Sequence, residues 1–122
     1  MNTDPARRIH LVDDDAPTAR VVRLSLAIEG LPLEMVASRD EALASIGKQP
    51  PDVLIMDYLM PGLSAADFIA RAREAGFVGP ILLCTAMDGQ IDLPVDGVIR
   101  KPFDPDELAA TVKALLPGPA PA

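Results

Sequence analysis

Short apolar runs alternate with longer amphipathic segments along this chain of 122 residues. Each apolar run is only four residues long, and most are followed directly by a charged or polar residue. The runs occupy residues 9–12, 33–36, 53–56, 81–84 and 97–100. Runs that are apolar on both faces are typical of strands in a buried parallel sheet.

The segments between these runs carry helix signals at their ends. Ser38 with Glu41, and Ser64 with Asp67, have the spacing of side chains that cap a helix N-terminus. Asp104 precedes a proline, which is the favoured residue at the first helical position. We predict helices over residues 17–29, 38–47, 64–76 and from 104 onward, the first three ended by Gly30, Gly47 and Gly76.

Alternating strands and helices with short connections predict an α/β fold of the doubly wound type. We expect a five-stranded parallel sheet with helices on both faces. Segment 86–96 is the exception, because it contains Gly89, Pro94 and only three apolar residues beyond Met87. We predict a loop or a single turn there, so that the fourth helix is short or absent.

Composition narrows the class of protein. Hydrophobic residues make up 49% of the chain, which is enough for one core, and the length of the chain suits one domain. We therefore expect residues 1–122 to form a single domain. Its core would lie at about 8–116, followed by a flexible proline-rich tail at 117–122. The net charge of −7 predicts no nucleic-acid partner. A single cysteine, the absence of a signal-peptide pattern and the absence of a long apolar run predict a cytoplasmic protein without a membrane partner.

Chemically reactive side chains follow the ends of the predicted strands. Asp13 and Asp14 follow the first strand and Asp57 follows the third, while Thr85 and Lys101 follow the fourth and fifth. In an open parallel sheet, these carboxyl ends are where ligands bind. Clustered carboxylates repel one another unless a cation joins them, and Mg²⁺ suits a site with few carboxylates. Asp57 would be the nucleophile, and Asp15 is interpreted as a helix cap.

Four motifs in order, Leu11–Asp15, Ile55–Gly62, Cys84–Ala86 and Arg100–Phe103, resemble the receiver domain of response regulators in two-component signalling. The resemblance spans about residues 8–116. It implies a flavodoxin-like sheet with strand order 2-1-3-4-5, and an Asp57 that accepts a phosphoryl group from a phosphohistidine on a histidine kinase or histidine phosphotransferase. The implied metal ligands are Asp13, Asp14, Asp57 and the backbone carbonyl of Leu59, and the implied phosphoryl contacts are Thr85 and Lys101.

The same resemblance assigns shaping roles to two prolines and exposes two departures. Pro61 and Pro102 shape the site, and the Lys101–Pro102 peptide is expected to be cis. Val98 stands where the family usually has a tyrosine or phenylalanine that acts as a switch. The segment before it is also shorter than usual, which identifies the chain as a divergent short receiver.

The favoured function is that of a phosphoacceptor, which is not an enzyme apart from its own phosphorylation and dephosphorylation. Two other functions stay open. One is a degenerate receiver that acts as a binding scaffold without being phosphorylated. The other is a small Mg²⁺-dependent phosphohydrolase, because residues 13–15 contain an Asp-x-Asp sequence in which Asp13 would be the nucleophile. A dinucleotide-binding fold is excluded, since no glycine-rich turn follows the first strand. His10 and Cys84 are interpreted as structural residues, His10 with its hydrogen bonds satisfied.

Overall fold

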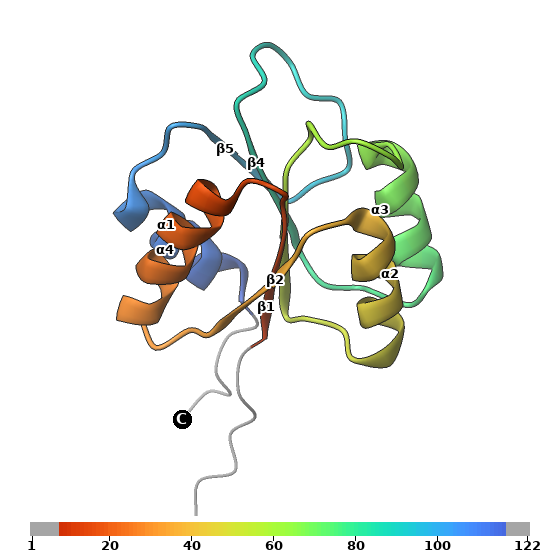
Figure 1. Ribbon diagram of the computed structural model, residues 1–122, viewed down its shortest axis with the longest axis horizontal. Coiled ribbons are helices and arrows are strands. Elements are labelled where there is room, and N and C mark those ends of the chain that lie inside the picture. The colour runs from red at the N-terminus through yellow and green to blue at the C-terminus, as the bar shows by residue number, and fades with distance from the viewer. Residues whose placement is uncertain (1–7, 117–122) are drawn as a thin grey trace, which may run out of the picture.

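A parallel sheet with helices on both faces forms the domain, as a computed structural model shows for residues 8–116 (Figure 1). The predicted tail at 117–122 lies outside these described residues. The elements in chain order are β1 (Ile9–Val12), α1 (Ala16–Ile28), β2 (Leu33–Val36), α2 (Arg39–Lys48), β3 (Val53–Met56), α3 (Ala65–Glu74), β4 (Ile81–Thr85), β5 (Gly97–Arg100) and α4 (Pro105–Leu115).

The strand order is β2-β1-β3-β4-β5, and every neighbouring pair is parallel. The chain winds outward in one direction from β1 to β2 and then in the other through β3, β4 and β5. The order reverses between β1 and β3, which is the place where an open α/β sheet forms its crevice. The predicted flavodoxin-like topology is confirmed.

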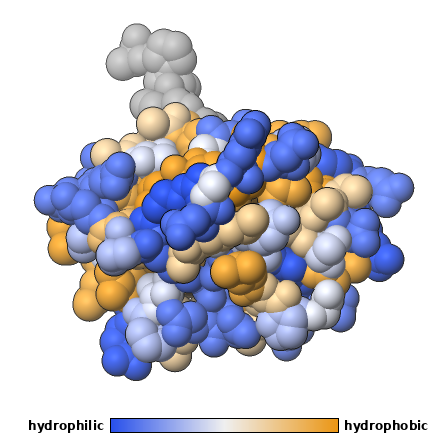
Figure 2. All heavy atoms as spheres, turned by 90° about the horizontal axis from the view of Figure 1, so that it is seen from above, coloured by the Kyte–Doolittle hydropathy of each residue, from blue (hydrophilic) through white to orange (hydrophobic). Residues whose placement is uncertain are grey.

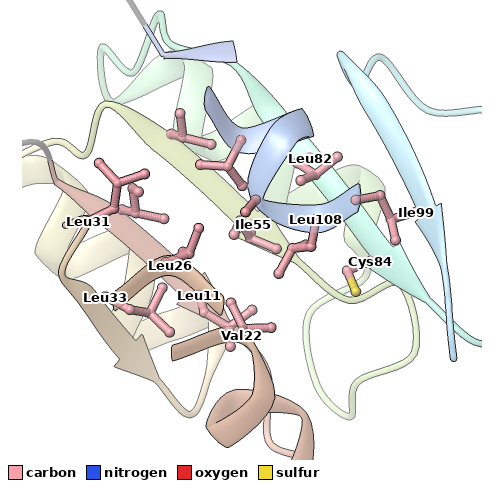
Figure 3. Packing of buried hydrophobic residues seen from close by; sticks show 14 of the residues in the cluster. Leu11, Val22, Leu26, Leu31, Leu33, Ile55, Leu82, Cys84, Ile99 and Leu108 are labelled. Atoms are coloured by element: carbon pink, nitrogen blue, oxygen red, sulfur yellow. The ribbon is translucent and has the colours of Figure 1, made fainter. Parts of the chain in front are cut away.

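Two hydrophobic layers cover the sheet, one on each face. Helices α1 and α4 lie on one face and α2 and α3 on the other (Figure 1). Figure 3 shows the first layer, in which aliphatic side chains from α1 and α4 pack against alternate residues of the inner strands. Leu11, Ile55 and Leu82 at its centre are each 0% exposed. Because β1, β3 and β4 are buried on both faces, their sequences are mostly apolar at successive positions rather than alternating, with His10 in β1 and Thr85 at the end of β4 as the polar exceptions.

The helices begin at the predicted caps. The hydroxyls of Ser38 and Ser64 accept hydrogen bonds from the backbone N–H groups of Glu41 and Asp67, each at 3.1 Å. Asp15 is the N-cap of α1, as interpreted from the sequence, and Asp104 is the N-cap of α4. These side chains satisfy backbone donors that the first turn of a helix leaves without partners.

Two expectations at this level are wrong. Gly47 does not end α2, which continues to Lys48 and is capped at Gln49, since Gly47 does not adopt the positive φ of a terminating glycine. His10 is buried, but its ring is not satisfied: neither ring nitrogen has a hydrogen-bond partner among the described residues, and the nearest carboxylate, Glu34, is 3.7 Å away.

The connection between β4 and β5 contains no helix, as the sequence predicts. Its partly buried Ile91, Leu93 and Val95 pack against the core layer under α2 and α3. Arg100 ties the beginning of this loop to β5 by donating hydrogen bonds to the carbonyls of Met87 and Gly89. The loop therefore covers part of the sheet with alternating apolar residues. In the part of the chain that the structure describes, no helix has the length and apolar character needed to cross a membrane.

Candidate functional site

The predicted site residues meet at the carboxyl end of the sheet, because the strand ladder continues one residue past the strands. The backbone N–H of Asp13 donates a hydrogen bond to the backbone carbonyl of Val36 (3.2 Å), and that of Asp57 to the carbonyl of Val12 (3.2 Å). The backbone N–H of Lys101 donates to the backbone carbonyl of Thr85 (2.8 Å). These backbone bonds fix the starting direction of each functional side chain. Viewed from above in Figure 2, this end of the molecule carries hydrophilic residues and small hydrophobic patches side by side.

One ammonium group joins two carboxylates from different strands. Nζ of Lys101 lies 3.1 Å from Oδ2 of Asp13 and 2.9 Å from Oδ2 of Asp57. Asp13 is fully buried, and only 7% of Asp57 is exposed. The peptide between Lys101 and Pro102 is cis, as the resemblance implies.

The electrostatics of this trio are unbalanced. Burial raises the pKa of the Asp13 carboxyl, and the hydrogen bonds from Asp15 and Lys101 only partly oppose that effect. Burial alone lowers the pKa of Lys101, but its hydrogen bonds to Asp57 and Asp13 outweigh burial, so its pKa is raised. A single positive charge is shared between two carboxylates, and this leaves the site with excess negative charge.

Asp14 and Thr85 lie at the same end of the sheet without joining the trio. Asp14 is exposed, and its carboxylate has no hydrogen bond or ion pair with other residues in the range 8–116. Thr85 is fully buried, and its hydroxyl accepts a hydrogen bond from the N–H of Met87 at 3.1 Å. The position of Val98 on the edge strand β5 is 40% exposed. The roles of Asp14 and Thr85 stay predictions, as do those of Asp13, Asp57 and Lys101.

The loop between β3 and α3 turns back on the phosphoacceptor candidate. The N–H of Leu59 donates to Oδ1 of Asp57 at 3.0 Å, a local turn that aspartate side chains favour. The chain then bends through Pro61 and Gly62, where Gly62 has a φ of 91° that side chains rarely adopt. Leu59 itself is 55% exposed.

The sequence reasoning missed Arg39, the first residue of α2. Only 3% of it is exposed. Its guanidinium donates to the backbone carbonyls of Asp57 (2.6 Å), Tyr58 (2.9 Å) and Leu63. An arginine directly after a helix cap reads as an exposed charge, so no local pattern distinguishes it from the other arginines of the chain.

The donor set suits a hard cation, although the side chains do not enclose one. Carboxylates and a backbone carbonyl are the oxygen ligands that Mg²⁺ takes, usually together with several waters. Within the described residues, however, no three acidic, histidine or cysteine side chains surround one position, and Asp13 and Asp57 are each paired with Lys101. The chemical type of the ligands fits Mg²⁺, whereas these side chains alone do not form a metal cluster.

Comparison with known proteins connects this geometry to a family. The family model described as "Response regulator receiver domain" matches residues 9–113. The response regulator MprA of Mycobacterium ulcerans is 36% identical over 89% of this chain and 50% of its own length. The DNA-binding response regulator MtrA of Mycobacterium leprae is 33% identical over 90% of this chain and 51% of its own length. The chain thus spans about half the length of the curated relatives it matches.

Solved structures agree on the fold. The chemotaxis protein CheY4 of Vibrio cholerae has a TM-score of 0.82 at 28% identity, covering 92% of this chain and all of that one (100%). A putative response regulator of Chloroflexus aurantiacus has a TM-score of 0.77 at 31% identity, covering 91% of this chain and 98% of that one.

The exclusion of a nucleic-acid partner from the net charge is wrong. Relatives that share this segment are named DNA-binding response regulators, and they are about twice as long as the matched region. The charge of −7 describes only these 122 residues, whereas phosphate contacts depend on the local charge of the surface that makes them. An acidic receiver segment therefore does not decide whether a protein binds DNA.

The family generally binds Mg²⁺, generally serves as a phosphoacceptor and is generally not enzymatic. The four motifs, the strand order, the reactive residues at the strand ends and the matched family model all lead to one conclusion. This chain belongs to the response-regulator receiver domain family.

Proposed function

We propose that Asp57 accepts a phosphoryl group from a phosphohistidine of a histidine kinase or a histidine phosphotransferase, in a reaction that requires Mg²⁺. The observation that carries the proposal is the Lys101 ammonium, which lies 2.9 Å from Asp57 and 3.1 Å from Asp13. A positive charge held at this place is what the transferred group needs, since phosphoryl transfer depends mainly on positioning and on charge stabilisation.

The transfer needs no reactant other than the phosphohistidine, the Asp57 carboxylate and water. An oxygen of the ionised Asp57 carboxylate attacks the phosphorus atom, and a P–O bond forms as the P–N bond to histidine breaks. The electron pair of the broken bond stays on the imidazole nitrogen, and the ring takes up one proton from water. Lys101 would move from the carboxylate oxygen toward the new phosphoryl oxygens, while the Thr85 hydroxyl would donate to one of them.

Asp13, Asp14, Asp57 and the carbonyl of Leu59 would hold the metal. When bound, Mg²⁺ supplies positive charge that neutralises the oxygens of the phosphoryl group. Asp13 contributes a fully buried carboxylate at a fixed position, and Asp14 an exposed one that is free to turn. Burial raises the pKa of Asp13, which disfavours its ionised form, and a bound cation would stabilise that form.

Phosphorylation would act by changing protein contacts near the β4–β5 loop. Thr85 already binds this loop through Met87, so a shift of its hydroxyl toward a phosphoryl group would release that contact. With Val98 in place of an aromatic ring, the change would not involve a ring turning inward. We further propose that residues 1–122 form one domain and that the only enzymatic properties of this domain are its own phosphorylation from phosphodonors and its own dephosphorylation. The protein would act in the cytoplasm with a downstream protein partner.

Acetyl phosphate and MgCl₂ provide the direct test of phosphorylation. The intact mass of the protein should increase by one phosphoryl group, and the increase should require Mg²⁺. Asp57→Asn should abolish it, because the amide is not a nucleophile at this site. Asp67→Asn, at an exposed position in the first turn of α3, is the matched control and should be labelled like the wild type.

Two outcomes would contradict the proposal. Labelling that persists in Asp57→Asn and disappears in Asp13→Asn would make Asp13 the nucleophile of a phosphohydrolase. No labelling of the wild type by acetyl phosphate or by a panel of phosphorylated histidine phosphotransferases would favour a degenerate receiver that serves as a scaffold.

A further inference from the structure

Arg39 connects helix α2 to the loop that carries the phosphoacceptor. It is the first residue of α2, and its side chain runs inward, so that only 3% of the residue is exposed. The guanidinium donates to three carbonyls on the segment 57–63, at Asp57, Tyr58 and Leu63. A buried charge that binds one loop at three points constrains the conformation of that loop.

We propose that Arg39 is a positioning residue, which holds the β3–α3 loop so that Asp57 and the Leu59 carbonyl are correctly placed for the metal and the phosphoryl group. The proposal rests on the function proposed above for Asp57. It concerns the backbone rather than the reacting atoms, because every acceptor of Arg39 is a main-chain carbonyl.

The contacts of Arg39 enclose the part of the loop that matters. Residue 59 lies between acceptors at Tyr58 and Leu63, so both ends of the turn are fixed from the α2 side. Asp57 is fixed twice: its carbonyl is bound by Arg39, and its carboxylate by the N–H of Leu59 (3.0 Å) and by Lys101 (2.9 Å). Release of the carbonyl would let the peptide planes after Asp57 turn, and the Leu59 carbonyl would turn with them.

The chemistry of arginine explains why this residue stands here. Its planar fork of N–H donors reaches several carbonyls at once, whereas a lysine ammonium is a compact charge on a flexible stem. Burial lowers the pKa of Arg39, and the negative charges of Asp57 and Asp14 oppose that effect. Its Nε has no partner among the described residues, which means that burying this side chain carries an uncompensated cost.

Arg73 offers a matched comparison within the same chain. It also donates to two loop carbonyls, those of Phe77 (3.0 Å) and Gly79 (2.7 Å), but that loop leads into β4 at the opposite end of the strands. If arginines that bind loop carbonyls only stabilise those loops, substitution of either residue should change Mg²⁺ binding and phosphorylation to the same small extent. If Arg39 positions the site, the two substitutions should differ.

The test compares Arg39→Ala, Arg39→Lys and Arg73→Ala with the wild type. MgCl₂ is titrated against the unphosphorylated protein while the fluorescence of Tyr58, the only tyrosine in a chain without tryptophan, is recorded. The midpoint gives the metal affinity. The rate of phosphorylation by acetyl phosphate is then measured at saturating Mg²⁺. Urea denaturation shows that each variant is folded at the temperature used, and Arg39→Lys keeps the test possible if Arg39→Ala does not fold.

We expect Arg39→Ala to weaken Mg²⁺ binding by about 10- to 100-fold, the range seen when groups that orient metal ligands are removed. Arg39→Lys should recover part of the loss, and Arg73→Ala should stay within about twofold of the wild type even where its stability falls. Equal Mg²⁺ affinities and rates for the wild type and both Arg39 variants would overturn the inference, as would an equal loss in Arg73→Ala. A wild type that neither binds Mg²⁺ nor accepts a phosphoryl group would instead refute the proposed function, and the inference with it.

Discussion

At the scale of single residues, Lys101 holds together groups that would otherwise repel. It is the cation shared by Asp13 and Asp57, which come from different strands. The sequence predicted a lysine near an acidic cluster from its place at a strand end. It did not predict that one ammonium would contact both carboxylates, because such a contact depends on how far the strands and side chains extend in three dimensions.

Lys101→Met should lower the free energy of unfolding by about 2–3 kcal/mol at neutral pH without Mg²⁺, since it leaves two carboxylates at a buried site without their partner. The raised pKa of Lys101 means that its stabilising effect is complete below the ordinary lysine value of 10.5 and is lost as the pH rises beyond it. Urea denaturation measures the difference.

In an Asp13→Asn background the same Lys101→Met substitution should cost clearly less, because one of the two carboxylates has been neutralised. Costs that are equal in both backgrounds would mean that the Lys101–Asp13 contact contributes nothing to stability.

Cys84 tests the burial of the sheet interior. It is fully buried in β4, and burial raises the pKa of its thiol to about 12. Alkylation by iodoacetamide at pH 8 should therefore be at least about 100-fold slower in the folded protein than in guanidinium chloride. Cys84→Ala should show no labelling. A folded protein that reacts as fast as the unfolded chain would contradict this packing.

At the scale of elements, the loop between β4 and β5 is the clearest departure from a regular alternation of strands and helices. Gly89, Pro94 and the low apolar content predicted the missing helix correctly, because these features disfavour helices wherever they occur. The way the loop is held was not predictable. Arg100 binds carbonyls 11 and 13 residues away, and no local pattern encodes contacts of that kind.

Arg100→Ala should loosen this loop without unfolding the domain. The hydrogen bonds to Met87 and Gly89 are exposed, so their loss should change global stability little while amide exchange in residues 86–90 accelerates. Hydrogen exchange with mass spectrometry can follow that segment. Arg71→Ala, another exposed arginine, serves as the control and should leave exchange in the loop unchanged.

Features of this fold that depend on local contacts were predictable from the sequence, and features that depend on long-range contacts were not. Helix starts at Ser38, Ser64 and Asp104 were predictable, since capping is a local interaction. The end of α2 was not, because a glycine ends a helix only where the following chain must turn through a positive φ. His10 shows a similar limit: its burial followed from the pattern, whereas its hydrogen bonding depended on side chains of the neighbouring strand.

At the scale of the whole molecule, charge has a local meaning and a global one. The net charge of −7 gave a wrong prediction about nucleic-acid partners, because it is the sum over a segment that covers only about half of the relatives' length. The local excess of negative charge around Asp13, Asp14 and Asp57 is more informative. It indicates a place where binding of a cation should stabilise the fold.

Mg²⁺ should therefore stabilise the folded protein by mass action. At a free concentration 100 times its dissociation constant, the gain in the free energy of unfolding should be about 2.7 kcal/mol. Thermal unfolding across a MgCl₂ series, with NaCl added to constant ionic strength, measures this gain. Asp13→Asn should reduce it strongly. An equal gain in Asp13→Asn would place the metal elsewhere.

The identity of the phosphorylated residue tests the central proposal most directly. After incubation with acetyl phosphate and MgCl₂, sodium borohydride reduces an acyl phosphate of aspartate to homoserine, and peptide mapping then locates the changed residue. We predict homoserine at position 57 and an unmodified Asp13. Homoserine at position 13, or no reduced aspartate in a protein shown to be folded, would contradict the assignment of Asp57 as the phosphoacceptor.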